Sequence, residues 1–168
     1  MKLETERLIL KEIDESYTDD ILKIRSNSYI NQYVKRNSPK NNYETLEFIL
    51  HIKNKRRNNE MLFWGISFKD QRNLIGTICL WNFSDDRQTA EVGYELLPDY
   101  HKKGIMSETL QGVLKFGFEV LNLQTILAYT HQSNEASQSL LLKHHFILEE
   151  GKKDNKNSEN VIFRLSRT

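Results

Sequence analysis

The chain is poor in the features that mark a protein for export or for a membrane. It has one cysteine among 168 residues, so it cannot form an internal disulfide, and this fits a reducing compartment. No apolar run approaches the length of a membrane-spanning helix, and the residues after Met1 contain no apolar stretch typical of a secretion signal. We therefore expect a cytoplasmic protein that does not associate with a membrane.

An excess of charge of one sign is also lacking. The 24 basic residues nearly balance the 23 acidic residues, and the net charge of +1 argues against a dedicated nucleic-acid binder. With 38% hydrophobic and 28% charged residues, the composition is that of an ordinary globular protein with room for a core. No repeat, linker or low-complexity segment divides the chain. We expect a single domain over residues 1–168.

The apolar periodicity alternates along the chain between helical and extended. The expected helices are residues 17–29, 43–55, 105–121 and 134–144. The expected strands are residues 8–11, 62–68, 74–81, 89–96, 125–130, 147–150 and 161–165. Turn-rich segments at 70–73 and 84–87 suit antiparallel hairpins. This order predicts an α+β domain, in which a mixed and mostly antiparallel central sheet is flanked by about four helices.

The segment from Glu91 to Leu110 carries the first functional signal. It is typical of a strand, a short basic loop and a helix whose first turn has no side chain competing for its amides. Those first N–H groups have no partner inside the helix, and the helix dipole adds partial positive charge there. A loop with Lys102, Lys103 and Gly104 therefore suits a diphosphate. On composition alone, a solvated basic turn remains an alternative.

Six short motifs follow one another along the chain, namely Thr5-Glu6-Arg7-Leu8-Ile9-Leu10, Leu74-Ile75-Gly76, Ala90-Glu91-Val92-Gly93-Tyr94, Lys103-Gly104-Ile105, Asn134-Glu135-Ala136-Ser137 and Phe146. Their order and spacing resemble the GNAT superfamily of acyl-CoA-dependent N-acyltransferases, and most of all its RimJ/RimL-like branch of ribosomal-protein N-terminal acetyltransferases. The resemblance covers nearly the whole chain and is weakest between Tyr29 and Met61. It implies a GNAT-like sheet splayed between the fourth and fifth strands, and an N-acetyltransferase that uses acetyl-CoA in a ternary complex.

The resemblance also implies where the cofactor binds. The implied cofactor-binding residues are Leu96, His101, Lys102, Lys103, Gly104, Ile105, Met106, Ser107 and Asn134. Only Gly104 matches the family's phosphate-loop pattern strictly. Met106 stands where a small residue normally lets the backbone approach the pyrophosphate, so the direction of its side chain decides its effect. The five histidines show no metal-ligand spacing with carboxylates, and we expect no metal.

Acyl transfer to an amine needs a group that removes the amine proton. Our first candidate is Glu91, on the strand that leads to the basic loop, and Glu60 is the reserve. Strand alternation places Glu91, Gly93 and Glu95 on one face of the strand. A glutamate on a strand is as often a solvated side chain, and that alternative stays open.

Asn134 and Ser137 open a helix, where an N-cap alone would explain them. The resemblance adds that Ser137 steadies the departing thiolate, so Ser137 joins Glu91 as a catalytic candidate. Leu141 stands where the family often carries a tyrosine acid, which leaves Ser137 or water as the proton source. Cys79 lies in an apolar run and reads as a small buried hydrophobe, not a nucleophile.

The acceptor and two other function classes remain open. A primary amine is required, and a protein or peptide N-terminus is the branch-level analogy, beside polyamines, aminoglycosides and small amino compounds. Met106 and Leu141 motivate an alternative, a non-catalytic acyl-CoA-binding or partner-binding module on the same fold. The basic cluster Lys53–Arg57 is the only support for an RNA-associated protein. We expect a monomer or a homodimer.

Overall fold

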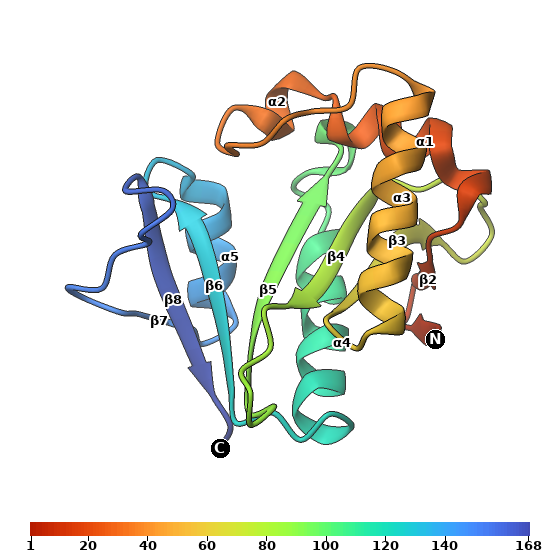
Figure 1. The fold of residues 1–168 in the computed structure, drawn as a ribbon. Helices are drawn as coiled ribbons and strands as arrows, with labels where there is room; N and C mark the ends of the chain where they lie inside the picture. The colour runs from red at the N-terminus through yellow and green to blue at the C-terminus, as the bar shows by residue number, and fades with distance from the viewer.

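A computed structural model describes residues 1–168, in which one mixed sheet of eight strands runs through the molecule (Figure 1). The strands lie in the order β1-β2-β3-β4-β5-β6-β8-β7, and only β5 and β6 are parallel. Their bounds are β1 Leu3–Glu4, β2 Leu8–Glu12, β3 Met61–Phe68, β4 Gly76–Trp81, β5 Thr89–Leu96, β6 Thr125–His131, β7 Ile147–Leu148 and β8 Asn160–Ser166. The expected α+β class and the two antiparallel hairpins are confirmed, while β1 was not foreseen.

Five α-helices flank the sheet, where the sequence suggested about four. They are α1 Thr18–Arg25, α2 Ser28–Asn31, α3 Asn42–Arg57, α4 Ile105–Glu119 and α5 Glu135–Lys143. The extra helix arises because the segment expected as one helix breaks in two. The side chain of Asn27 accepts a hydrogen bond from the amide of Ile30, so it starts α2 as an N-cap after α1 has ended.

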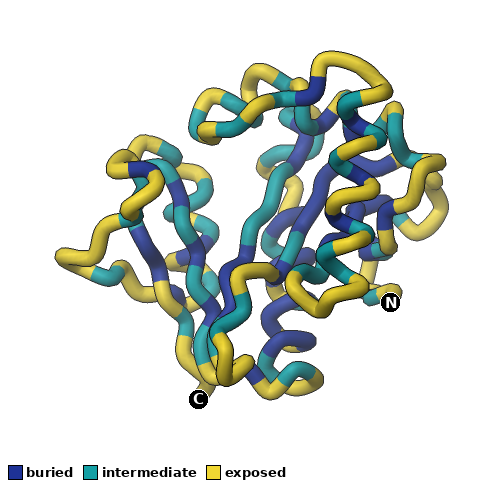
Figure 2. The backbone as a smooth tube through the Cα atoms, viewed as in Figure 1, coloured by how far each residue is buried: buried dark blue, intermediate teal, exposed yellow.

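Side chains that alternate along the central strands build two hydrophobic clusters, one on each face of the sheet. Buried residues accordingly recur along the central strands and along α4 (Figure 2). On one face Trp64 packs edge-on against Phe116 of α4, with ring centroids 5.8 Å apart. On the other face Phe63 meets Phe48 of α3 at 5.7 Å. No helix is long and apolar enough to cross a membrane.

The sheet divides into two arms, because β5 and β6 pair over only three residues. Thr89, Ala90 and Glu91 lie opposite residues 125–127, and beyond Glu91 the two strands separate. One arm carries β1 to β5 with α1, α3 and α4, and the other carries β6, β8 and β7 with α5 (Figure 1). The expected splay between the fourth and fifth predicted strands is confirmed at this junction.

Gly76 provides a test of the packing that positions β5. A Cβ atom at this position would lie 2.3 Å from the carbonyl oxygen of Glu95, which is backbone and cannot rotate away. We expect Gly76→Ala to lower the free energy of unfolding by about 1–3 kcal/mol, measured by urea denaturation. The control is Gly112→Ala on α4, where the nearest atom is the methyl group of Thr5 at 3.1 Å. Equal unfolding midpoints for Gly76→Ala and the wild type would contradict this account.

Candidate active site

The separation of β5 from β6 leaves backbone groups of β5 facing the gap. The carbonyl of Gln88 accepts from the amide of Thr125 on β6, whereas the carbonyl of Thr89 accepts from Ser84 on the opposite side. Successive residues of a strand direct their backbone groups to opposite edges. The amides of Tyr94 and Leu96, which share the parity of Gln88, therefore point into the gap, past the last residue pair at Glu91.

The side chains of β5 divide between the two faces of the sheet as its alternation predicts. Val92 and Leu96 belong to the hydrophobic cluster that contains α4. Glu95 lies on the opposite face, where its carboxylate binds Arg36 from the segment between α2 and α3. Glu91 shares the face of Glu95, so the strand presents a carboxylate on one face and Tyr94 on the other.

Glu91 lies at the vertex of the gap. Its side chain is only 8% exposed, and its Oε1 accepts a hydrogen bond from Nδ2 of Asn82 at 2.6 Å. Burial raises the pKa of the Glu91 carboxyl above its usual value, and the negative charge of Asp154 adds to this, while the hydrogen bond from Asn82 and the charge of Lys156 oppose it. A carboxylate with a raised pKa is a stronger base than an ordinary glutamate, which suits the removal of an amine proton.

On the other face, Tyr94 meets Ser137 of α5 across the gap. The phenol oxygen of Tyr94 lies 2.8 Å from Oγ of Ser137, and both residues line the same cleft. Burial raises the pKa of Tyr94 to about 12, so the phenol stays protonated. Leu141 is fully buried in the core and cannot supply a proton. No local sequence pattern indicated the Tyr94–Ser137 pair, because the partners are 43 residues apart.

Asn134 serves as the N-cap of α5, as its position suggested. Its Oδ1 accepts a hydrogen bond from the amide of Ser137 at 3.2 Å. The residue also lines the cleft, so the cap and the hydroxyl of Ser137 are fixed at one helix start.

The basic loop leads into α4 with a backbone that leaves the first helical amides free. Lys102 and Gly104 have φ angles of 60° and 72°, and Gly104 caps α4 without a side-chain hydrogen bond. Glycine adopts this left-handed conformation without steric cost. Met106 is 9% exposed and packs into the cluster around α4, so its side chain points away from the loop. The Met106 side chain therefore does not obstruct the approach of a diphosphate to the loop.

Other residues predicted to bind a cofactor are already held by neighbours. Nε2 of His101 bonds to the carbonyl of Leu96 at 2.8 Å and closes the loop. Nζ of Lys103 donates to the carbonyl of Asp99 at 2.8 Å, and Oγ of Ser107 bonds to Nε2 of His144 at 2.8 Å. Ile105 is buried, so it can offer a ligand only its backbone. Lys102 is the loop's exposed basic side chain without such a bond.

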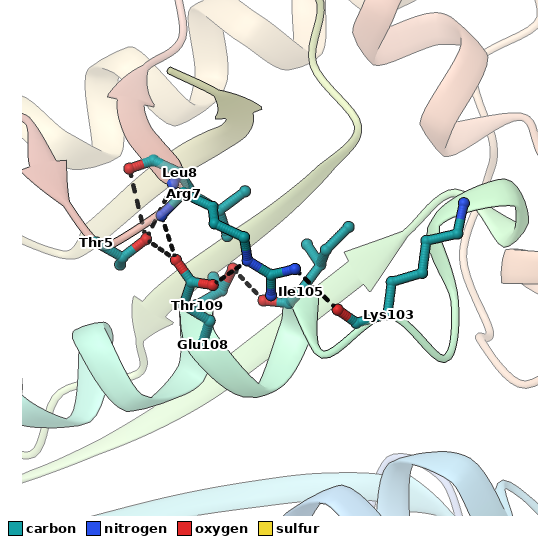
Figure 3. A network of polar contacts seen from close by, with 7 residues as sticks. All are labelled: Thr5, Arg7, Leu8, Lys103, Ile105, Glu108 and Thr109. Atoms are coloured by element: carbon teal, nitrogen blue, oxygen red, sulfur yellow. Dashed lines mark hydrogen bonds and ion pairs between the residues drawn. The ribbon is translucent and has the colours of Figure 1, made fainter. Parts of the chain in front are cut away.

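The motif at the start of the chain braces this loop (Figure 3). Oε1 of Glu108 accepts hydrogen bonds from the hydroxyl of Thr5 and the amide of Arg7, and its Oε2 accepts from Nε of Arg7 at 2.7 Å. Nη1 of Arg7 donates to the carbonyl of Lys103 at 3.1 Å. Burial favours a higher pKa for Glu108, but the hydrogen bonds from Thr5 and Arg7 and the charge of Arg7 outweigh it, so its pKa is lowered. The motif Thr5–Leu10 at the start of the chain thus has a physical role in holding the basic loop.

A cleft of about 530 Å³ occupies the gap between the arms. The segment after α2 roofs it, since Tyr33, Val34 and Lys35 are among its lining residues. The ring of Tyr33 lies 5.3 Å from the ring of His131 on the far arm. Trp81, which is 37% exposed, forms part of the cleft wall.

Three other sequence-based candidates fit the geometry poorly. Glu60 is exposed, binds Lys55 and is not among the residues lining the cleft, so the geometry favours Glu91 over the reserve base. Burial raises the pKa of the Cys79 thiol to about 12, which suits a small hydrophobe and not a nucleophile. In the cluster Lys53–Arg57, three cations pair with Glu15, Glu60 and Glu12. Such pairing leaves little free charge for RNA.

Comparison with known proteins agrees with this arrangement. The acetyltransferase (GNAT) domain family matches residues 7–147. YoaA of Bacillus subtilis (strain 168), described as an uncharacterized N-acetyltransferase, is 33% identical over 141 residues, which cover 84% of this chain and 80% of that protein.

Two solved structures share the fold. The ribosomal-protein-S5-alanine acetyltransferase from Vibrio fischeri superposes with a TM-score of 0.83 at 20% identity, over 99% of this chain and 96% of that one. RimL, a ribosomal L7/L12 alpha-N-protein acetyltransferase in complex with coenzyme A, superposes with a TM-score of 0.84 at 18% identity, over 99% and 98%. The family match spans most of the chain, including β5 and β6, where the sheet splays. This chain belongs to the GNAT acetyltransferases and is an acyl-CoA-dependent N-acyltransferase.

Proposed function

We propose that the protein acts in the cytoplasm and transfers the acetyl group of acetyl-CoA to a primary amine by direct attack within a ternary complex. The observation that carries this proposal is the division of the gap. Glu91 faces it from one side of β5, and the Tyr94–Ser137 pair closes the other side. A base for the amine and a donor for the sulfur thus lie on opposite faces of one strand.

The proposed position of acetyl-CoA is supported by the backbone groups that the fold leaves free. The diphosphate lies against Lys102 and the amides at the start of α4, where the helix dipole favours negative charge. The pantetheine arm then follows the open edge of β5 past Asn134. The thioester oxygen would accept a hydrogen bond from the amide of Tyr94, which points into the gap beyond the last residue pair between β5 and β6. A fixed backbone donor of this kind stabilises the tetrahedral oxyanion.

The reaction then divides its proton steps between the two faces. Glu91 takes a proton from the amine as the nitrogen attacks the thioester carbon. The carbon–sulfur bond breaks, and the sulfur leaves as a thiolate that solvent protonates. The hydroxyls of Tyr94 and Ser137 share one hydrogen bond. In the proposed reaction the phenol is its donor, which leaves the hydroxyl proton of Ser137 free to bond to the departing sulfur. Ser137 is the catalytic residue here, and Tyr94 positions it.

The acceptor class we propose first is the α-amine of a protein or peptide. Its support is fold-level analogy, because structural neighbours are named as acetyltransferases of ribosomal proteins. The features that motivated a non-catalytic module lose their force, since Met106 points into the core and Tyr94 replaces the missing tyrosine of α5 as a polar partner. A mass-spectrometric screen of amines and N-terminal peptides tests the acceptor directly.

The loop makes a prediction about cofactor affinity. Lys102→Glu places a negative charge where the diphosphate binds, and we expect the dissociation constant for acetyl-CoA to rise about tenfold or more by isothermal titration. Lys115→Glu, on the exposed side of α4, is the matched control and should bind as the wild type does. Equal affinities for the two variants would place the diphosphate elsewhere.

Glu91 makes a prediction about pH. A base must be ionised, so kcat/KM should fall as pH drops through the raised pKa of Glu91, above the usual glutamate value of 4.5. Glu91→Gln should lower kcat by about 10²–10⁴-fold and remove this acid limb, while the dissociation constant for acetyl-CoA stays nearly the same. Glu60→Gln serves as the control. Wild-type turnover by Glu91→Gln across the pH range would make Glu91 a bystander.

Ser137 and Tyr94 should behave as one unit. A hydrogen bond to a charged group is worth about 1.5–3 kcal/mol, so Ser137→Ala should lower kcat by about tenfold to a hundredfold. Tyr94→Phe should have a smaller effect in the same direction, and the double variant should resemble Ser137→Ala alone. Tyr43→Phe, at an exposed tyrosine of α3, is the control. Fully additive losses in the double variant would show that the two hydroxyls act separately.

A further inference from the structure

The charges around the acceptor side of the cleft are sorted by depth. Glu91 lies at the floor and is buried. Three lysines from two different segments lie around the mouth and are exposed. Lys35 comes from the roof after α2, and Lys153 and Lys156 come from the segment between β7 and β8. An approaching ligand therefore meets three ammonium groups, beside the hydrogen-bonded carboxylate of Asp154, before it reaches the buried carboxylate of Glu91.

The positive charge at the mouth is only partly neutralised. Nζ of Lys35 lies 3.8 Å from Glu159, but both side chains are largely exposed, so the pair is weak. The ammonium groups of Lys153 and Lys156 form no ion pair or hydrogen bond within the protein. The nearby carboxylate of Asp154 is engaged at both oxygens, by the amide of Lys156 and by Nδ2 of Asn160, each at 2.9 Å.

The segments that carry these lysines are held in place. Arg36, next to Lys35, binds Glu95 on β5 and donates to Oδ1 of Asn31 at 2.7 Å. Between β7 and β8, the turn closed by Asp154 fixes the backbone on either side of Lys156. The lysines thus surround the cleft at positions set by the fold, although their side chains reach into solvent.

From this arrangement we infer that the acceptor carries an anionic group, a carboxylate or a phosphate, beside its reactive amine. The amine goes to the floor at Glu91, and the anionic group stays at the mouth among Lys35, Lys153 and Lys156. The inference rests on the proposed transfer to an amine and narrows its substrate class. It also disfavours polyamines, because their additional ammonium groups would lie among the lysines.

Two sources of such an acceptor differ in what surrounds the amine. A peptide supplies the anion from acidic side chains after its first residue, and a phosphorylated amino sugar supplies it from the phosphate. The interior of the cleft contains the rings of Tyr33, Trp81 and Tyr129 and the amide groups of Asn82 and Asn157, which suit either source. Matched pairs of acceptors distinguish them.

The experiment measures release of free coenzyme A thiol with four acceptors in two pairs. Glucosamine 6-phosphate is compared with glucosamine, and a peptide beginning Ser-Asp-Asp is compared with one beginning Ser-Ala-Ala. Spermidine is the cationic reference. We expect the anionic member of at least one pair to have the higher kcat/KM, and this advantage to shrink as ionic strength rises. Spermidine as the best acceptor, or no charge preference in either pair, overturns the inference.

Variants connect the preference to the lysines. In Lys153→Gln, the ratio of kcat/KM for the anionic over the neutral acceptor should fall about threefold to tenfold, chiefly through KM. Lys153 is the better test than Lys156, because Lys156 also lowers the pKa of Glu91. Lys152→Gln is the matched control, since Lys152 pairs with Glu149 and does not line the cleft. An unchanged ratio in Lys153→Gln overturns the inference.

Measurements of acceptor binding test the inference of an anionic acceptor separately from the proposed transfer reaction. Titration of each acceptor into the protein saturated with coenzyme A reports affinity without turnover. Tighter binding of the anionic member that Lys153→Gln abolishes supports the inference even if no acceptor releases thiol, a result that would instead count against the proposed transfer. Turnover without any preference for the anionic acceptor supports the proposed acetyl transfer and contradicts the inference that the acceptor is anionic.

Discussion

The site depends on how early β5 and β6 stop pairing. Only three residue pairs join β5 to β6, and past this pairing the backbone of β5 has a strand neighbour on one edge only. A backbone amide that is buried without a partner costs about 1–3 kcal/mol, so the open edge must be met by water or by a ligand. The same divergence separates the side chains on the two faces of β5. The sheet therefore contains a gap with two approaches. One ligand can enter along the backbone edge of β5, and another can reach the gap from the opposite face.

The remaining structure holds this gap in a fixed shape. The two hydrophobic clusters pack α1, α3 and α4 onto the β1–β5 arm, and Val92 and Leu96 of β5 belong to one of them. At one end of the gap, Thr5 and Arg7 fasten the phosphate loop through Glu108, which explains why a motif at the N-terminus accompanies a loop a hundred residues later (Figure 3). At the other end, Arg36 anchors the roof to Glu95. The loop at one end of the gap and the roof at the other are thus fixed by separate contacts within one domain.

Much of this could be predicted from sequence, because the signals are local. Apolar periodicity gave the bounds of β5 and nearly those of α4, and the glycine and the free first turn indicated the loop that leads into α4. Strand parity placed Glu91 and Glu95 on one face correctly. The wrong prediction of one long helix near the N-terminus also had a local cause. Asn27 interrupts an amphipathic pattern that otherwise continues, so α2 was hidden within a longer predicted helix.

The parts that sequence could not give depend on tertiary contacts. Tyr94 looked like an ordinary strand residue until α5 brought Ser137 to it, and the direction of Met106 followed only from the packing of α4. The lysines at the mouth belong to segments 118 or more residues apart, with no shared motif. In each case the role of the residue depends on which elements the fold places side by side.

Amide hydrogen exchange followed by NMR directly tests whether acetyl-CoA lies along the open edge of β5. Addition of acetyl-CoA should slow exchange at Tyr94 and Leu96, whose amides point into the gap. Exchange at Gly93 and Glu95 should change little, because the amides of these residues point toward β4, so one strand contains both the test and its control. Protection confined to other segments, with Tyr94 and Leu96 unaffected, would show that the acyl donor does not lie along this edge.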